Sequence, residues 1–195
     1  MFLVPIDTPG FRIGKIFNKS GWRFYQNAEL IFDNARVPHA NVVGSVHGGV
    51  KVRSGAAGEF GDFELAANAL GVCDAAVENA MRFAKSEKRA GKPLADHQLV
   101  QLKLNEMHAL TEALRSYVLR TAWEMDNHTQ GVNAVLIMNW ATSVIQRVTT
   151  LNMDIHAKGG GQIDAMADKL VRDAIIWTHL AGDASQKLKA VRRLA

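Results

Sequence analysis

The amino-acid sequence predicts a mainly α-helical protein, an antiparallel up-and-down helical bundle preceded by a short β-rich segment. Apolar residues recur every three or four positions along most of the chain after Asp62, which is the pattern of amphipathic helices. No proline follows Pro93, and proline is costly inside a helix, so long helices are permitted there. The opening forty residues instead hold three of the four prolines and short apolar runs separated by turn signals, as strands do.

Residues 1–44 are expected to be the remnant of a β-domain. Phe2–Val4 and Ala28–Phe32 read as strands, and Asp7–Gly10 reads as a turn. A segment of about two to four strands is too small to fold alone. Because the chain opens in the middle of a strand, we expect it to be part of something larger.

Residues 45–61 are expected to be a flexible, glycine-rich linker. A phosphate cradle is the alternative interpretation. The segment holds neither a GxxxxGK[ST] motif nor a GxGxxG motif that opens a helix, which favours the linker. Residues 62–195 then form the helical bundle.

Five helices are expected in the bundle, over 62–88, 94–125, 132–156, 164–178 and 183–194. Asp62 is the expected N-cap of the first helix, Gly91 is its expected C-cap, and Pro93 opens the next element. The run Val135–Met138 is apolar all round, which indicates a helix buried on several sides. Short connections between long helices favour antiparallel neighbours.

The composition argues against several classes of protein. With 48% hydrophobic and 22% charged residues and a net charge of +4, the chain has the balance of a folded domain. Its one basic tail, Lys187 to Arg193, lacks aromatic residues for base stacking, so we expect no nucleic-acid partner. No window has the ~18 consecutive apolar residues of a membrane helix, so no membrane partner is expected either. The single Cys73 permits no internal disulfide, which favours a cytoplasmic setting.

The histidines and tryptophans have structural interpretations. No HExxH motif and no pair of histidines at i, i+4 occurs, so we expect no metal site. Trp123, Trp140 and Trp177 lie in helical segments and are expected to pack in the core or in an interface.

Two sets of short strings follow one another along the chain in a distinctive order and spacing. The first set is Phe2–Pro5, Thr8–Gly10, Glu29–Asp33 and Arg36–Pro38. The second set is Ala69–Gly71, Gly91–Leu94, His97–Gln98, Gly159–Gly161 and Val171–Ala174. Nearly from end to end these strings resemble the acyl-CoA dehydrogenase family, the first set the last strands of its middle β-domain and the second set its C-terminal helical domain.

This resemblance implies an FAD-linked oxidoreductase that removes two hydrogens across Cα–Cβ of an acyl-CoA thioester. In that family a carboxylate abstracts the Cα proton while the flavin accepts a hydride. Members are usually tetramers in which the helical domains make the central contact and the flavin lies between subunits. The family's N-terminal helical domain and the front of its β-domain have no counterpart in this sequence, so we expect the chain to be inactive alone.

The resemblance does not place a catalytic base at its usual position. The usual glutamate is Ala181 in this chain, which cannot take a proton, and Asp183 lies two residues beyond it. Other members carry the base near the start of the first bundle helix, where this chain has Asp62 and Glu64. Both residues also have a structural interpretation: Asp62 as an N-cap, and Glu64 as a first-turn acid that interacts favourably with the helix dipole. Asp62, Glu64 and Asp183 are the candidates that remain.

The flavin-contacting positions that the resemblance assigns to the first helical connection are partly altered. Glu87 stands where the family has an arginine that reaches the flavin diphosphate, and a carboxylate repels a diphosphate. Ala90 stands in place of an aromatic residue. Lys88 and Arg89 are close in sequence and are the candidates to compensate. Gln98 keeps the family pattern close to the cofactor.

The second flavin-contacting segment of the family is altered too. Asp154 stands in place of a glutamine, and Ala157 and Lys158 stand in place of two glycines. Only Gly160 keeps its place. Glycine there would let the backbone approach a cofactor, whereas a lysine side chain would obstruct it or supply a charge.

Two interpretations of function follow. In the first, the chain is part of an FAD-dependent acyl-CoA dehydrogenase, works within a homo-oligomer or a mixed tetramer, and binds acyl-CoA if a complete site forms. In the second, it is a non-catalytic oligomerisation or structural paralogue that lacks flavin and base, an alternative that Ala181 and Glu87 favour.

Overall fold

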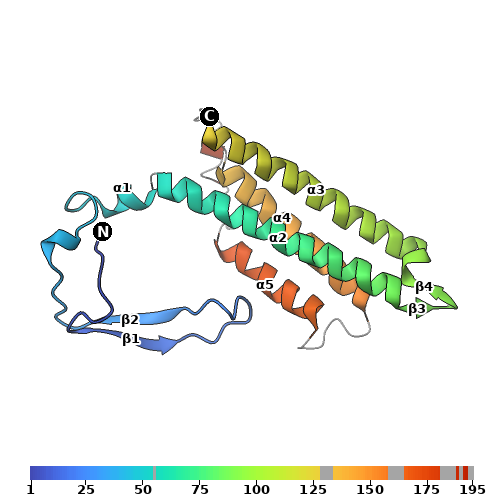
Figure 1. Cartoon of the computed structure of the whole chain (residues 1–195), viewed down its shortest axis with the longest axis horizontal. Helices are drawn as coiled ribbons and strands as arrows, with labels where there is room; N and C mark the ends of the chain where they lie inside the picture. The colour runs from blue at the N-terminus through green and yellow to red at the C-terminus, as the bar shows by residue number, and fades with distance from the viewer. Residues whose placement is uncertain (55, 128–133, 158–164, 181–187, 189–190, 193–195) are drawn as a thin grey trace. The chain divides into compact units, whose positions relative to one another are not determined.

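The structure is a computed structural model that describes residues 1–54, 56–127, 134–157, 165–180, 188 and 191–192. It divides the chain into two compact units, Met1–Phe60 and Gly61–Ala195. Figure 1 shows a two-stranded sheet in the first unit, and the long helices with a short two-stranded hairpin in the second. The mainly helical fold class predicted from periodicity is confirmed. None of the described helices is both long enough and apolar enough to cross a membrane.

The first unit is built around a two-stranded antiparallel sheet. Strand β1 (Phe11–Ile16) pairs with β2 (Ala28–Phe32), as Figure 1 shows in blue. Gly10, in the turn just before β1, has φ +85°, and a Cβ there would lie 2.1 Å from the carbonyl oxygen of Asp33. The turn therefore requires glycine at this position. The opening residues form a β-bridge between Phe2 and Val42, and the 3₁₀ helix η1 (His39–Asn41) lies just before it.

The sheet gathers its apolar side chains on one face. Opposite residues share a face, and Phe11 is opposite Phe32 while Ile13 is opposite Leu30. A β-bulge then places two residues of β1 against one of β2, so that Ile16 is opposite Ala28 and joins the same face. Ile13, Ile16, Leu30 and Phe32 are each at least half exposed. We call this surface the apolar sheet face.

The expected flexible linker is largely helical, which corrects the prediction for residues 45–61. Helix α1 (Gly49–Ser54) and the first turns of α2 (Ala56–Ser86) occupy most of that range. Glycine costs only about 1 kcal/mol relative to alanine in a helix, so a glycine-rich stretch does not exclude one. Asp62 consequently lies in the second turn of α2 and does not cap its N-terminus.

The bundle helices otherwise follow the predicted ranges to within a few residues. They are α2, α3 (Gln98–Asp126), α4 (Ala134–His156) and α5 (Met166–Leu180). The fifth predicted helix, 183–194, lies almost entirely outside the described residues. Figure 1 shows these helices lying alongside one another, with α2 joined to α3 by a hairpin.

Helix α4 supplies much of the core. Its fully or nearly fully buried apolar residues are Ala134, Ile137, Met138, Ala141, Val144, Ile145, Val148 and Leu151. The predicted burial of the run Val135–Met138 is thus confirmed for Ile137 and Met138. Buried threonines satisfy their hydroxyls within the helices, as Thr142 Oγ1 does by donating to the Met138 carbonyl at 3.0 Å.

The tryptophans divide between core and surface. Trp177 of α5 is buried, and its indole Nε1–H donates to the carbonyl oxygen of Leu65 at 3.0 Å, which ties α5 to α2. Trp140 is half-buried and lies 6.1 Å from Tyr117 between ring centroids. Trp123 is 60% exposed, so it does not pack in the core of this chain.

Candidate functional site

The connection between α2 and α3 is a tight β-hairpin that carries most of the predicted cofactor-facing residues. Strand β3 (Lys88–Arg89) pairs with β4 (Lys92–Pro93) across a two-residue turn. Ala90 and Gly91 in the turn have φ +48° and +81°, the signs of a type I′ turn. Gly91 therefore turns a hairpin and does not cap the helix, which ends earlier, at Ser86. The prediction was wrong because a helix C-cap and this turn both select a residue at positive φ.

Hydrogen bonds fix the hairpin to the start of α3 through the 3₁₀ helix η2 (Leu94–Asp96). The Leu94 amide donates to the Glu87 carbonyl at 2.8 Å. The His97 ring lies with Nε2 3.1 Å from the Arg89 carbonyl, so Nε2 carries the proton. Lys92 Nζ donates to the Asp96 carbonyl at 3.1 Å. The hairpin is thus held in place before any ligand binds.

The hairpin orients its charges on two faces. Successive residues of a strand point to opposite sides, so Lys88 and Arg89 do not act together. Arg89 is instead opposite Lys92 and shares its face, which gives that face two cations. With Glu87 and Asp96 counted, the hairpin holds three cations against two carboxylates. This positive surplus suits an anionic group such as a diphosphate, although Glu87 reduces it.

Asp154 and Ala157 lie at the end of α4, near the same end of the bundle. Asp154 is ion-paired with Lys103 at 3.2 Å, and Lys103 lies about 7.5 Å along α3 from Gln98. The pairing neutralises the Asp154 carboxylate, which would otherwise repel a phosphate. Ala157 donates its amide to the Met153 carbonyl at 3.1 Å. Lys158 and Gly160 lie outside the described residues.

A polar cluster that the sequence analysis missed lies between α2 and α4. Asn79 Nδ2 donates to Asn152 Oδ1 at 3.3 Å and lies 3.3 Å from His156 Nε2. His156 Nδ1 lies 2.8 Å from the Asn152 carbonyl and must donate to it, which leaves Nε2 of the neutral ring as an acceptor. Phe83 stacks on the His156 ring at 4.1 Å between centroids. Asn152 is fully buried, and its Nδ2 has no hydrogen-bond partner.

A signal for this cluster was present in the sequence. Asn79 falls among the buried alanines of α2, and Asn152 and His156 are four residues apart on α4, where side chains share a face. The three residues lie toward the C-terminal ends of α2 and α4, and they connect these two helices there.

The candidate bases are remote from the hairpin. Asp62 is half-buried and Glu64 is exposed, and both lie near the start of α2, about 36 Å along that helix from its end at Ser86. Two residues apart on a helix, they face different directions. Ala181 and Asp183 lie outside the described residues.

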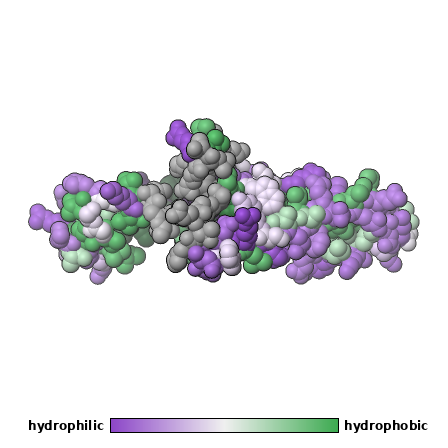
Figure 2. All heavy atoms as spheres, turned by 90° about the horizontal axis from the view of Figure 1, so that it is seen from above, coloured by the Kyte–Doolittle hydropathy of each residue, from purple (hydrophilic) through white to green (hydrophobic). Residues whose placement is uncertain are grey.

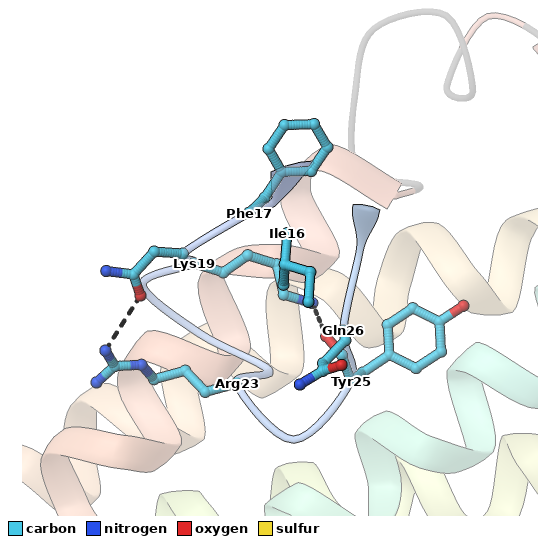
Figure 3. A pocket seen from close by; sticks show the side chains of 7 residues that line it. Ile16, Phe17, Lys19, Arg23, Tyr25 and Gln26 are labelled. Carbon is cyan, nitrogen blue, oxygen red and sulfur yellow. Dashed lines mark hydrogen bonds between the residues drawn. The ribbon is translucent and has the colours of Figure 1, made fainter. Parts of the chain in front are cut away.

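Two further hollows occur on the described surface. In the first unit, a cavity of about 230 Å³ lies in the loop between β1 and β2 (Figure 3). Lys19 Nζ donates to the Tyr25 carbonyl and to Asn27 Oδ1, and Arg23 donates to Asn18 Oδ1 at 3.2 Å. These contacts close the loop on itself, and they leave the cations bound by neutral oxygens.

The other hollow is a groove of about 620 Å³ between α2 and α3. Its floor includes Val77 and Met81, and Arg115 crosses one end to reach Asp74. Hydrogen bonds from Arg115 to Glu112 and Asp74 raise the pKa of the Arg115 guanidinium further above its usual range. The groove is open to solvent, and Thr111, a buried polar residue that lines it, donates its hydroxyl to the Met107 carbonyl at 2.8 Å.

Comparison with known proteins gives matches along almost the whole chain. The sequence model described as the C-terminal domain of acyl-CoA dehydrogenase matches residues 59–193. An acyl-CoA dehydrogenase of Bacillus subtilis is 34% identical over 177 residues, which are 89% of this chain and 46% of that protein. The mitochondrial short-chain specific acyl-CoA dehydrogenase of Mus musculus is 35% identical over 178 residues, 90% of this chain and 42% of that protein.

The structural comparison agrees. The structure of butyryl-CoA dehydrogenase from Megasphaera elsdenii superimposes with a TM-score of 0.92 and 30% identity, over 99% of this chain and 51% of that one. The chain therefore spans about half the length of the relatives it matches.

Proposed function

Because the chain belongs to the acyl-CoA dehydrogenase family, we propose that it is the C-terminal part of an FAD-dependent enzyme for α,β-dehydrogenation of an acyl-CoA thioester. The observation that carries the proposal is the match of nearly the whole chain to half of such proteins. The chain is then incomplete alone, and it functions in a homo-oligomer or mixed tetramer, where other segments complete the acyl-CoA pocket.

The described residues that would face FAD are those of the hairpin and the start of α3. Arg89 and Lys92 on one face of the hairpin would bind the diphosphate, and Gln98 would donate a hydrogen bond. When bound, FAD supplies the hydride acceptor of the reaction. The hydrogen bonds from Leu94, His97 and Lys92 hold this surface in one conformation, which lowers the entropy cost of binding.

The proton acceptor is proposed to come from one of two sources. Asp62 or Glu64 on α2, or Asp183, is the internal source, and a carboxylate of another polypeptide is the external one. A base must lie within hydrogen-bond reach of the Cα proton, so the choice depends on where the acyl chain binds. Replacing Asp62, Glu64 or Asp183 by the matching amide in an active complex separates the two sources.

The test compares the chain alone with the chain produced together with the N-terminal half of the Bacillus subtilis relative. The absorbance of retained flavin and the oxidation of butyryl-CoA with a dye acceptor are measured after gel filtration. We expect the chain alone to be colourless and inactive, and the pair to be yellow. Arg89→Ala should weaken flavin retention several-fold, whereas Arg82→Ala, which removes only an exposed pair with Glu78, should not. A yellow, active chain on its own would contradict the proposed incompleteness.

The non-catalytic alternative has one structural feature in its favour. The exposed Glu87 carboxylate stands beside the cations of the hairpin, where it would repel a diphosphate. If the two halves form a stable complex that remains colourless in excess FAD, the chain is an oligomerisation paralogue.

A further inference from the structure

The turn of the hairpin between α2 and α3 contains a residue in an unfavourable backbone conformation. Ala90, the first residue of the turn, has φ +48°, which lies in the left-handed region that residues other than glycine, asparagine and aspartate seldom adopt. A type I′ turn needs positive φ at both of its central residues, and Asn-Gly or Gly-Gly is a usual pair. Gly91 meets this need and Ala90 does not, so contacts from outside the turn are needed to hold it.

The hydrogen bond from His97 is placed to hold this turn. Its Nε2 lies 3.1 Å from the carbonyl oxygen of Arg89, which belongs to the peptide group that precedes Ala90. That peptide group is planar, so fixing its carbonyl also restricts the rotation at Ala90. His97 is half-buried, whereas the residues from Lys88 to Lys92 are exposed. The bond therefore anchors an exposed turn to a better-shielded side chain.

His97 occupies a position at which other side chains stabilise a helix better. It is the N-cap residue of α3, with φ −93° and ψ 126°, and serine, threonine, aspartate and asparagine are preferred there. In the part of the chain that the structure describes, the His97 side chain caps no amide of α3 and is directed at the hairpin instead. This residue type at this position is explained by the turn and not by the helix.

The geometry of the turn sets where the two cations of the hairpin lie. Arg89 and Lys92 flank the turn, are opposite each other and share one face. A two-residue turn of another type would change the twist between the strands and move the two side chains apart. Figure 2 shows mostly hydrophilic residues (purple) at the end of the helical unit where Figure 1 places this hairpin. The cations are thus presented to solvent in an arrangement that depends on the turn.

We propose that His97 is a positioning residue, which holds the type I′ turn of the hairpin and thereby places Arg89 and Lys92 for the diphosphate of FAD. The inference rests on the proposed function, to which the cofactor belongs, and it adds how that site keeps its shape. His97 acts through the Arg89 carbonyl and does not itself contact the cofactor. Without His97, the turn relaxes toward negative φ at Ala90, and binding must first restore the strained conformation.

The first test examines the hairpin in the chain alone, without flavin. Trypsin cleaves after Arg89 when the hairpin opens, so the rate at which the fragment beginning at Ala90 appears reports this opening. His97→Ala should raise the rate several-fold. His97→Gln should stay close to the wild type, because its amide donates from about the place of Nε2. Gln101→Ala removes a matched bond, from the side chain to the Ala95 carbonyl at 3.0 Å, and should leave the rate unchanged.

The second test measures the dissociation constant of FAD by flavin fluorescence, for the chain combined with the N-terminal half of the Bacillus subtilis relative. His97→Ala should weaken binding by roughly three- to ten-fold, the effect of losing one hydrogen bond. Adding Ala90→Gly to this variant should recover most of the loss, because glycine adopts positive φ freely, and the same change should affect the wild type less. His97→Ser supplies a cap for α3, so it should keep or raise the thermal midpoint while it weakens FAD binding.

A histidine that only stabilises the fold would give a different pattern. FAD binding and the thermal midpoint would then fall together in His97→Ser, and Ala90→Gly would not restore binding to His97→Ala; either result would overturn the proposal. So would an unchanged cleavage rate in His97→Ala. A wild-type pair that binds no FAD contradicts the proposed function and, with it, the cofactor role of His97. The cleavage test is read without the cofactor, so the two failures are distinguishable.

Discussion

Cys73 lies on the inward side of α2 and is fully buried. Burial in apolar surroundings, with a smaller contribution from the neighbouring Asp74 carboxylate, raises the pKa of the Cys73 thiol from 9.0 to about 12. The thiolate is the reactive form, so at neutral pH the native protein presents an inert, neutral thiol. Its role is that of a small apolar side chain.

The reactivity of Cys73 should therefore report unfolding. At pH 8 the native chain should react with an aromatic disulfide reagent only at the rate of its opening, whereas the chain in denaturant should react at once. An Ala109→Cys variant provides an exposed thiol on the same scaffold and should give one fast equivalent of reaction. Fast labelling of the native wild type would show that Cys73 is not buried in solution.

The raised pKa of the Cys73 thiol makes the folding stability fall as the pH rises above 9. A raised pKa for an acid means that the folded state disfavours the thiolate, so the stability from Cys73 is fully present below pH 9. It is lost as the pH rises from 9 toward 12, because in this range the thiol of the unfolded chain ionises while the thiol of the folded chain stays neutral. The Cys73→Ala variant should lack this part of the alkaline loss.

At the scale of elements, helices α2 and α4 are joined near their C-terminal ends by polar side chains. Asn79 donates toward both Asn152 Oδ1 and His156 Nε2, each at 3.3 Å, across a contact otherwise lined by apolar residues. A buried polar group that loses its partner costs more free energy than the pair contributes. The cluster consequently fixes one registry of the two helices, because sliding either helix would leave several polar atoms unpaired.

Removing single members of this cluster should destabilise the chain more than removing all of them. Asn79→Ala leaves acceptors on Asn152 and His156 unpaired and should cost about 1–3 kcal/mol of unfolding free energy. The triple variant Asn79→Ala, Asn152→Ala, His156→Leu replaces the cluster by apolar groups and should recover a large part of that loss. Urea unfolding followed by circular dichroism measures each value, and strict additivity of the three substitutions would contradict the network.

Sequence periodicity predicted the elements well, and its failures have physical reasons. Apolar spacing locates α2 to α5 because a helix buries one face whatever it packs against. Glycines at 45–61 predicted a loop, but their helix propensity is a small cost that neighbouring residues offset. Gly91 predicted a helix end but lies in a type I′ turn, because a glycine at positive φ suits both.

The candidate site was predictable in part. The resemblance predicts Glu87 to Ala90, Gln98 and Asp154 as cofactor-facing positions without any knowledge of geometry, and these stay predictions. It could not supply the partner of Asp154, because Lys103 lies 51 residues away and only the antiparallel packing of α3 and α4 brings it near. The same holds for Asn79 and His156, which are 77 residues apart.

At the scale of the whole molecule, the two units differ in how well they shield their backbone hydrogen bonds from water. The unit Gly61–Ala195 buries a continuous apolar core. The unit Met1–Phe60 relies on a two-stranded sheet whose apolar sheet face is largely exposed, and such small sheets are marginal in water. About half the length of each relative lies outside the match.

Hydrogen exchange should reveal this difference directly. Amides of β1 and β2 should exchange within seconds to minutes, whereas those near Val148 and Leu151 in α4 should require opening of the bundle. Addition of the N-terminal half used in the flavin test should slow exchange in β1 and β2 and leave α4 nearly unchanged. Equal protection of both units in the isolated chain would contradict this account.

The β-bulge in β1 also limits which insertions and deletions a lineage can accept. Gly14 and Lys15 of β1 stand against Glu29 alone, so the loss of either one would restore regular pairing and keep Ile16 opposite Ala28. The loss of both would bring Ile16 opposite Glu29, and the side chain of Ile16 would move to the other face of the sheet because side chains alternate along a strand. In an alignment of relatives, the loss of one residue in this short stretch should therefore keep an apolar residue at position 16, whereas the loss of two should coincide with a change of residue type there.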